Sequence, residues 1–354
     1  MPSHSTWYPS LAPDKMVARC KGTGGKRAAA LLLALLTVLS GCKNQNLKKS
    51  EAPPMAAYAL SNPNADETTK SVYKYLCSLN GETTLSAQQE STWMGSADYE
   101  MDYIYAHTGK LPAMRGLDYM HDDFAGVNKR AAQWWQQGGL VTICWHTGAD
   151  FTGEWKDCME SSIQDWDAVL REGTEENKTF IAGMDKAGHA LQQLQEQGVT
   201  VLWRPFHEFD GKWFWWGKGG PENFVRLWHM MYTHFTRDLG LNNLIWVLGY
   251  SHLYTGYDGW YPGDAYVDVI GADSYEGGVQ NKLYQALRKI TVTKPSAFHE
   301  CGTNPTAEEL ATTPWAWFMT WHTTFVTEGN TPEALDALYN SDQVITRDQL
   351  PTFG

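Results

Sequence analysis

The sequence predicts a single α/β domain folded as a (β/α)8 TIM barrel, and three observations lead to that prediction. Eight short apolar runs of the kind found in parallel strands follow one another along the chain. Amphipathic helical patterns lie between several of these runs. The runs also extend over about 250 residues, which is the usual size of such a barrel. No Gly-rich phosphate loop follows the first run, which disfavours an open dinucleotide-binding sheet.

Each expected strand is a short run of mostly apolar residues. In chain order the strands are Leu85–Gln88, Ala113–Leu117, Leu140–Trp145, Val199–Arg204, Leu244–Gly249, Val267–Ala272, Ser296–His299 and Trp315–Thr320. Between them, Gly183–Gln197 and Asn223–Leu239 repeat apolar residues at the spacing of one helix face, and Gly198 ends the first segment. Apolar strands that alternate with such helices indicate a parallel sheet covered by helices.

Composition narrows the class of ligand. The 354 residues carry a net charge of −12, and residues 1–41 hold five of the basic side chains and one of the acidic ones. The remainder therefore has 23 basic against 39 acidic residues, a net charge of −16. So negative a body excludes nucleic acid as a natural partner and favours a neutral ligand. The 17 tryptophans exceed what core packing needs, so we expect aromatic stacking surfaces in a binding cleft.

The N-terminal segment has the pattern of an export signal. The basic stretch Arg19–Arg27 precedes an apolar run that is too short to span a bilayer, and Leu39–Cys42 resembles a bacterial lipobox. We therefore expect residues 1–41 to be a lipoprotein signal peptide, with Met16 as an alternative start. Cys42 would be lipidated, residues 42–67 would form a flexible linker, and residues 68–354 the catalytic domain. The predicted product is an exported lipoprotein of the outer membrane that faces the periplasm or the cell surface.

Four cysteines remain in the expected domain, and their spacing favours no pairing: Cys77, Cys144, Cys158 and Cys301. Export permits disulfides, so the pairing stays open. The sequence contains no CxxC and no HExxH motif, so it gives no support to a metal site. We expect no cofactor and, for a tethered barrel, a monomer.

Two glutamates follow expected strands. Glu208 ends the stretch Trp203–Glu208, which continues through a run of aromatic residues to Gly217, and Glu300 directly follows the expected strand Ser296–His299. Active sites of barrels lie at the carboxyl ends of the strands, so both side chains are expected at one mouth. Two carboxylates about 5 to 5.5 Å apart suit retaining glycoside hydrolysis, in which one is the nucleophile and the other the acid and then the base.

The stretch Trp203–Gly217, WRPFHEFDGKWFWWG, resembles the signature of glycoside hydrolase family 26, best known for endo-β-1,4-mannanases. Further stretches match in the same order: Gly116–Tyr119, Trp145–His146, Tyr261–Asp264 with Val267–Asp268, Gly271–Tyr275 and Glu300–Gly302. The resemblance covers about residues 80 to 325. It implies a (β/α)8 barrel whose acid/base and nucleophile lie at the ends of strands four and seven.

Carried over by residue, the resemblance implies that Glu208 is the general acid/base and Glu300 the nucleophile. Arg204 would hold Glu300 ionised. The other implied sugar-binding or orienting side chains are His146, His207, Trp213, Tyr275 and Trp321. Trp315 and Trp317 compete with Trp321 for the role of stacking floor, because strict alternation places all three on one strand face.

The resemblance implies a retaining endo-β-1,4-mannanase that cuts internal bonds of mannan, galactomannan or glucomannan into manno-oligosaccharides without a metal or organic cofactor. Two alternatives stay open. The same barrel and chemistry suit mixed-linkage β-glucan or β-1,3-xylan, because loop residues select the glycan. A surface glycan-binding lipoprotein without catalysis would be expected to lack one of the two glutamates, and both are present.

Overall fold

A computed structural model describes residues 59–79, 81–252, 257 and 259–353. Its nine strands are β1 (Thr84–Gln89), β2 (Met114–Asp118), β3 (Leu140–Cys144), β4 (Val201–Arg204), β5 (Leu244–Tyr250), β6 (Val269–Ser274), β7 (Ser296–Cys301), β8 (Trp317–Thr320) and β9 (Val344–Ile345). The first eight are the expected strands, and no end differs from its expected position by more than two residues.

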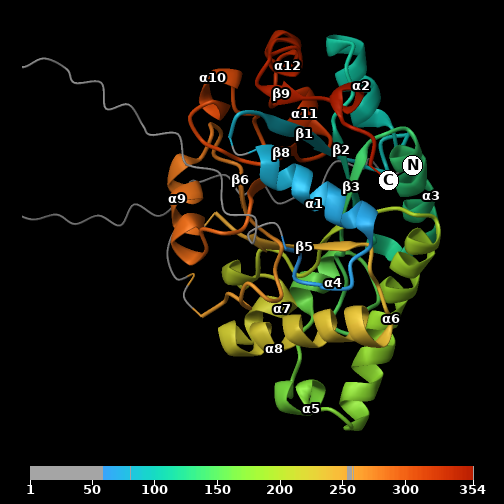
Figure 1. Cartoon of the computed structure of the whole chain (residues 1–354). Helices are drawn as coiled ribbons and strands as arrows, with labels where there is room; N and C mark the ends of the chain where they lie inside the picture. The colour runs from blue at the N-terminus through green and yellow to red at the C-terminus, as the bar shows by residue number, and fades with distance from the viewer. Residues whose placement is uncertain (1–58, 80, 253–256, 258, 354) are drawn as a thin grey trace, which may run out of the picture. The chain divides into compact units, whose positions relative to one another are not determined.

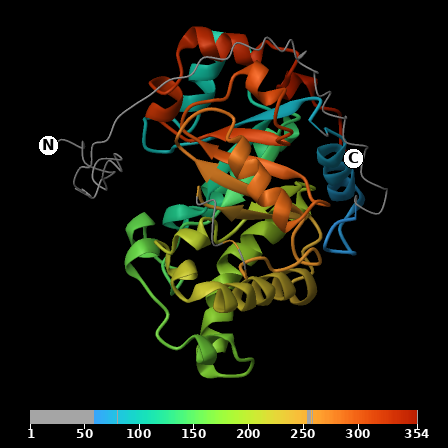
Figure 2. The ribbon, with the colours of Figure 1, turned by 90° about the vertical axis from the view of Figure 1, so that its left-hand side faces the viewer.

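The eight strands close into a barrel. Neighbours pair in parallel from β2 round to β8, β8 pairs with β1, and β1 pairs with β2, which completes the ring. The short β9 adds to β1 at its N-terminal end, where Thr84 pairs with Val344. Figures 1 and 2 show the strands in the middle of the domain, with helices around them. The predicted (β/α)8 fold is confirmed.

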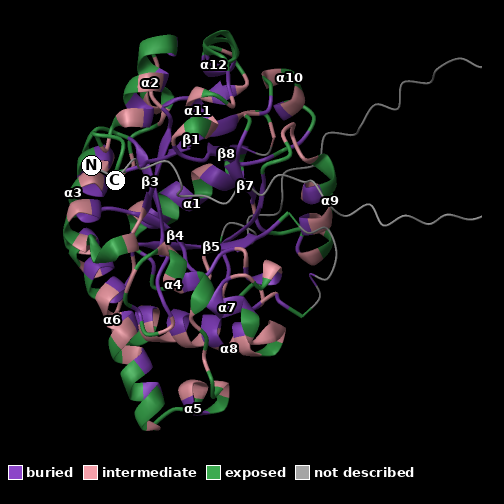
Figure 3. Ribbon diagram, turned by 180° about the vertical axis from the view of Figure 1, so that it is seen from behind, coloured by how far each residue is buried: buried purple, intermediate pink, exposed green. Residues whose placement is uncertain are grey.

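The helices form the outer layer: α1 (Glu67–Leu79), α2 (Tyr99–Thr108), η2 (Met120–Asp122), α3 (Phe124–Gln136), α4 (Trp155–Glu160), α5 (Trp166–Leu170), α6 (Glu175–Glu196), η3 (Phe209–Gly211), α7 (Trp215–Lys218), α8 (Gly220–Thr233), η4 (His234–Asp238), α9 (Asn281–Ile290), α10 (Ala307–Leu310), α11 (Thr324–Thr327), α12 (Pro332–Tyr339) and η5 (Arg347–Gln349). In Figure 3 the strands are buried, whereas the helices turn exposed residues outward. Among the described residues, no helix has the length and apolarity that a membrane span needs.

Two helices differ from the sequence prediction. α6 begins at Glu175, because the Thr174 side chain accepts a hydrogen bond from the Asn177 amide and caps the helix start. The single helix expected over residues 223–239 is instead α8 followed by the π-helical turn η4. In that turn the His234 ring contacts Asp185 of α6 at 2.7 Å.

The folded domain also begins before residue 68. α1 starts at Glu67, the Ser61 amide donates to Asp268 at 2.5 Å, and the buried Asn62 donates to the Leu241 carbonyl at 3.0 Å. The expected linker is therefore shorter at its C-terminal end. The predicted signal peptide 1–41, the lipidated Cys42 and most of the linker lie outside the described residues.

Apolar side chains pack inside the barrel and between the barrel and its helices. Trp317 and Trp321 belong to the inner cluster, together with Met319. Trp315 precedes β8 and belongs to the outer cluster, where its ring lies 5.5 Å from that of Phe298. The expectation that all three tryptophans share one face is therefore wrong, because strand alternation begins only at Trp317.

The four cysteines are buried in the described domain as free thiols: Cys77, Cys144, Cys158 and Cys301. No pair among them forms a disulfide. Burial raises the thiol pKa values of all four, so they behave as small core side chains.

Candidate active site

Most of the predicted site residues lie at the carboxyl ends of the barrel strands. Glu208 follows β4, Glu300 lies in β7, and Tyr275 follows β6 directly. His146 follows β3, and Trp321 follows β8. Because these strands are parallel neighbours in one closed sheet, their ends meet at one mouth.

The turn after β4 is built from unusual backbone conformations. Arg204 ends the strand and is buried in the barrel, and then Phe206 and Glu208 both take left-handed φ values of 51° and 54°. Non-glycine residues occupy this region at a cost of about 1 to 3 kcal/mol each, and they cluster at functional sites. The Glu208 amide donates to the Gly249 carbonyl of β5 at 2.7 Å, which fixes the turn against its neighbour.

Gly249 leaves the space that this turn needs. A Cβ atom at this position would lie 2.8 Å from Cε1 of His299 and 3.0 Å from Cβ of His207. Neither neighbour can withdraw easily, because both are buried in the barrel interior. The glycine therefore allows two histidines to approach β5 closely.

Glu208 lies in an environment that favours its protonated form. Burial, and after it the nearby charge of Glu300, together raise the pKa of Glu208 to about 8. The indole Nε1–H of Trp213 donates to Oε2 of Glu208 at 2.9 Å, which opposes the rise in part. The side chain is thus a carboxylic acid near neutral pH and can donate a proton.

Glu300 points to the mouth because β7 contains an irregularity. Ala272 pairs with Phe298, but the next residue of β6, Asp273, pairs with Glu300, so His299 is an extra residue on β7. Strict alternation would have turned Glu300 to the same side as Phe298, which packs against Trp315 outside the barrel. The extra residue lets both His299 and Glu300 face the interior.

Three side chains surround the Glu300 carboxylate. Nη1 of Arg204 lies 2.8 Å from Oε1, the Tyr275 hydroxyl donates to Oε2 at 2.6 Å, and Nε2 of His207 lies 3.6 Å from Oε1. Arg204 and Tyr275 thus hold the carboxylate in place, one through a charged contact and the other through a neutral hydrogen bond. Although its hydroxyl is engaged, Tyr275 is 42% exposed, so one ring face remains open at the mouth.

Beneath the two glutamates lies a buried pair without a predicted role. His299 Nδ1 and Asp273 Oδ1 are 2.5 Å apart, and Asp273 Oδ2 is 3.8 Å from Arg204 Nη1. Burial and then the charges of Glu300 and Glu208 raise the pKa of Asp273 well above its usual range. Asp273 belongs to the matched stretch Gly271–Tyr275. Its contact with His299 depends on the irregularity in β7, which cannot be recognised in the sequence.

His146 contacts both the β2 end and the β4 turn. Its Nδ1 lies 2.5 Å from Oδ2 of Asp118, and its amide donates to Oδ1 of Asp118 at 3.0 Å. Its ring stands edge-on to His207 with centroids 4.7 Å apart. Asp118 belongs to the matched stretch Gly116–Tyr119, but the resemblance implied no role for it.

Trp321 extends the inner face of β8 to the mouth. Its amide donates to the Cys301 carbonyl at 2.9 Å, and its own carbonyl accepts from Gln88 Nε2 at 3.0 Å. These bonds hold the backbone on both sides. Only 7% of Trp321 is exposed, so its ring lies in the floor of the barrel mouth and does not protrude from it.

Two groups of potential metal ligands occur among the described residues: Asp118, Cys144 and His146, and His207, Asp273 and Glu300. In the first, both oxygens of Asp118 already contact His146. In the second, the fixed positive charge of Arg204 lies 2.8 Å from Glu300 and would repel a cation. Hydrogen bonds and ion pairs within the protein thus already engage both groups.

The comparisons with known proteins agree with this geometry. The family model for glycosyl hydrolase family 26 matches residues 61–349. A mannan endo-1,4-beta-mannosidase of Thermothelomyces thermophilus is 32% identical over 82% of this chain, and mannan endo-1,4-beta-mannosidase A and B of Caldalkalibacillus mannanilyticus is 34% identical over 69%. The alignments span 63% and 52% of the lengths of these two relatives.

Solved structures show the same fold. A beta-mannanase from a symbiotic protist of the termite Reticulitermes speratus, complexed with gluco-manno-oligosaccharide, superimposes with a TM-score of 0.77 at 30% identity. That match covers 83% of this chain and 98% of the other. GH26A from Muricauda sp. MAR_2010_75 gives a TM-score of 0.76 at 32% identity, over 82% of this chain and all of the other.

Proposed function

The chain belongs to glycosyl hydrolase family 26, and from this we propose that it is a retaining endo-β-1,4-mannanase. Its substrates would be mannan, galactomannan or glucomannan, cut at internal bonds to manno-oligosaccharides. The observation that carries the proposal is the contrast between two carboxyl groups at one mouth. Glu208 is kept protonated, and Glu300 is held by Arg204 and Tyr275.

The mechanism follows from that contrast. An oxygen of Glu300 attacks the anomeric carbon while Glu208 gives its proton to the glycosidic oxygen, so the bond to the leaving sugar breaks as the bond to Glu300 forms. Glu208, now ionised, takes a proton from water, and the resulting hydroxide oxygen displaces Glu300 from the anomeric carbon. The product keeps the configuration of the substrate, and both glutamates return to their starting protonation states.

The remaining residues support binding and orientation in this proposal. Trp213 would line the sugar site beside the cleaved bond, where it already holds Glu208. His146 and His207 would bind sugar hydroxyls at the other side of the mouth, and Trp321 would be the floor under the reacting sugar. We favour mannan over other β-glycans as the substrate, because the relatives and the superimposed protist enzyme are named as mannanases.

The test is product analysis of the purified protein on linear mannan, mixed-linkage β-glucan and β-1,3-xylan. We expect short manno-oligosaccharides from mannan, a fall in viscosity that precedes the release of reducing ends, and no products after Glu300→Ala. Cleavage of another glycan alone would keep the two glutamates but overturn the substrate. Binding of mannan without any cleavage would support the non-catalytic alternative.

We also propose that the chain is an exported lipoprotein anchored through Cys42 and otherwise monomeric. The support is the basic stretch, the apolar run and the lipobox-like Leu39–Cys42 in the sequence. Expression in a bacterial host with radiolabelled palmitate should label the protein, and Cys42→Ser should abolish the label and release the enzyme from membranes. An unlabelled but exported wild type would indicate an ordinary secretion signal.

A further inference from the structure

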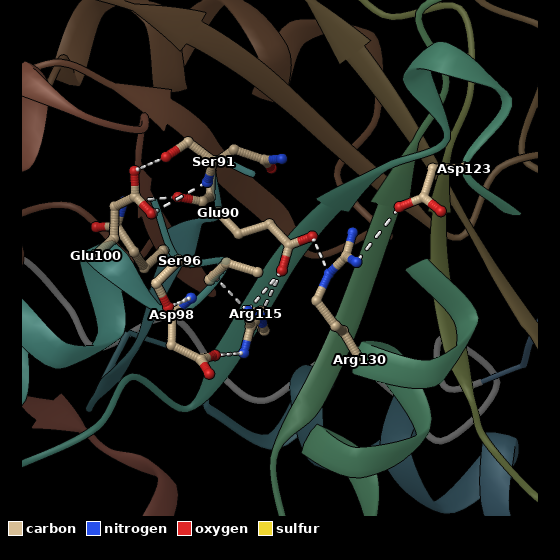
Figure 4. A network of polar contacts seen from close by, with 11 residues as sticks. Glu90, Ser91, Ser96, Asp98, Glu100, Arg115, Asp123 and Arg130 are labelled. Atoms are coloured by element: carbon tan, nitrogen blue, oxygen red, sulfur yellow. Dashed lines mark hydrogen bonds and ion pairs between the residues drawn. The ribbon is translucent and has the colours of Figure 1, made fainter. Parts of the chain in front are cut away.

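A buried carboxyl group that the proposed mechanism does not use links two loops at the barrel mouth. Glu100 is the second residue of α2 and is 0% exposed. The amide and hydroxyl of Ser91, in the loop after β1, donate to its two oxygens at 3.0 and 2.7 Å (Figure 4). The amide of Thr323, in the loop after β8, donates to Oε1 at 2.8 Å. One side chain of α2 therefore joins the loops that follow two neighbouring strands.

The three donors to Glu100 are neutral groups: two backbone amides and one hydroxyl. Burial of a carboxyl group is unfavourable unless hydrogen bonds replace those that water would give. A carboxylate can accept at both oxygens, whereas the amide of a glutamine presents only one oxygen and a donor. The residue type at this position therefore suits the linkage between the two loops, and the packing of α2 alone would not need it.

The backbone at Thr323 has a conformation that needs support from its surroundings. Its φ is 53° and its ψ is −121°, and among the described non-glycine residues with a left-handed φ it is the only one that is β-branched. Glycine adopts this conformation freely, whereas a branched side chain makes it unfavourable. Strained residues persist where neighbouring contacts fix them, and they cluster at functional sites. The hydrogen bond from the Thr323 amide to Glu100 is such a contact.

The turn at Thr323 lies between two side chains that matter for the proposed reaction. Trp321, two residues before it, lies in the floor of the barrel mouth. Phe325, two residues after it, packs its ring 5.0 Å from that of Tyr275, whose hydroxyl donates to Glu300 at 2.6 Å. A change in the turn would therefore displace the floor under the reacting sugar and also the hydrogen-bond donor of the proposed nucleophile.

The loop after β1 has further support of its own. Arg115 donates to Asp98 at 2.7 Å, and the buried Glu90 accepts from Arg115 and from Arg130, both at 2.8 Å (Figure 4). These ion pairs remain when the Glu100 carboxylate is removed. Its loss should therefore act mainly on the loop after β8.

We propose that Glu100 is a positioning residue for the reaction, which holds the turn at Thr323 in its strained conformation and thereby fixes Trp321 and Tyr275 at the cleavage point. The inference rests on the proposed glycanase function. The predicted effect is on kcat, because groups at the cleaved bond are displaced while sugars farther away keep their contacts. The carboxylate should also become dispensable once the backbone at residue 323 adopts its conformation without strain.

The first test compares Glu100→Gln and Glu100→Ala with Asp102→Asn, a matched change of an exposed acid in the first turn of α2. On mannan, Glu100→Ala should lower kcat about tenfold to a hundredfold and change KM less than about threefold, as expected when reacting groups are displaced. Glu100→Gln keeps the volume and one acceptor oxygen, so its loss should be smaller. Asp102→Asn should match the wild type. A wild-type kcat in both Glu100 variants would overturn the proposal.

The second test asks whether glycine at residue 323 restores the activity. Thr323→Gly alone should keep kcat within about twofold of wild type, because glycine adopts this φ and ψ without a steric penalty. When it is combined with Glu100→Gln, kcat should return to within about threefold of wild type. Thr324→Gly, at the exposed next residue, should not restore Glu100→Gln. If Thr323→Gly also fails to restore it, Glu100 is merely structural and the proposal is wrong.

Hydrogen exchange separates this proposal from the proposed function. The amides of residues 321–329 are followed by mass spectrometry in the whole protein. Glu100→Ala should speed their exchange at least about tenfold, because the turn opens more often, and Asp102→Asn should not. If the wild type cleaves no glycan, the proposed function fails, while faster exchange in Glu100→Ala would still support the positioning of the turn. Unchanged exchange in Glu100→Ala would overturn the positioning role even in an active enzyme.

Discussion

The ends of β4 and β7 carry the same residue type in opposite surroundings. At the β4 end, Glu208 is half-buried, receives one neutral donor from Trp213 and has its pKa raised to about 8. At the β7 end, Glu300 is 3% exposed but is contacted by the Arg204 guanidinium and the Tyr275 hydroxyl. The two glutamates therefore differ in their partners as well as in burial, because the more buried one has the charged partner and the other has a neutral donor.

The backbone produces this difference. In the turn after β4, Phe206 and Glu208 take left-handed conformations, while Arg204 stays buried at the end of the strand. The extra residue in β7 brings Glu300 inward to Arg204. Two local departures from regular strand geometry thus give two identical side chains the separate surroundings that the proposed acid and the proposed nucleophile need.

The largest expected effect comes from removing Glu300, the proposed nucleophile. Glu300→Ala should lower kcat on mannan on the order of 10⁵-fold, because no other group can form the covalent intermediate. Azide should restore part of the activity on an aryl mannoside with a good leaving group, and it should yield the α-mannosyl azide, since it attacks from the side that Glu300 occupied. A β-mannosyl azide product would contradict the proposed role of Glu300 as the nucleophile.

Removing the acid should have a smaller effect that depends on the leaving group. Glu208→Ala should lower kcat on mannan between about 10²-fold and 10⁴-fold. An activated aryl mannoside needs no proton, so its first step should keep near wild-type rates, and azide should then give the β-mannosyl azide. Opposite azide stereochemistry in the two variants would sharpen the contrast between the strand ends, and the same stereochemistry in both would break it.

The next largest effect is expected from removing the hydrogen bond that Tyr275 donates to Glu300. Tyr275→Phe removes the 2.6 Å hydrogen bond to Glu300 but keeps the ring, whose centroid lies 5.0 Å from that of Phe325. A hydrogen bond to a charged group is worth about 1.5 to 3 kcal/mol, so kcat should fall between about tenfold and a hundredfold. Thermal unfolding should stay at the wild-type midpoint. A normal kcat would mean that Arg204 alone suffices to hold the nucleophile.

The barrel and both glutamates were predictable from the sequence because their signals are local. Apolar runs identify the strands, and a long aromatic motif directly after one strand identifies the position of Glu208. β7, which contains Glu300 and ends at Cys301, was also predictable, but only as far as His299, because strict alternation would turn Glu300 away from the barrel interior. The resemblance supplied the role that alternation could not.

The remaining features depend on contacts between distant segments. The His299–Asp273 pair joins β7 to β6 and needs the room that Gly249 and Gly271 leave, so no single stretch reveals it. The loop between β1 and α2 is likewise held by Glu100, Arg115 and Thr323, which come from three separate segments.

The smallest expected effect tests the β4 end by pH. Glu208 must be protonated to act, so kcat/KM should be fully present below the pKa of Glu208 and decline as the pH rises through about 8. The Trp213 indole stabilises the ionised form, so Trp213→Phe should raise the pKa of Glu208 and move this basic limb to higher pH. The maximal rate should change less than about tenfold, since a neutral hydrogen bond is worth about 1 kcal/mol.

Trp135→Phe, on the outer helix α3, provides the matched control and should leave the basic limb in place. A basic limb that moves to lower pH in Trp213→Phe would mean that the indole supports the acid and not its anion. In that case the two strand ends would differ by burial and by Arg204 alone, and Trp213 would act on the sugar instead of on the catalytic acid.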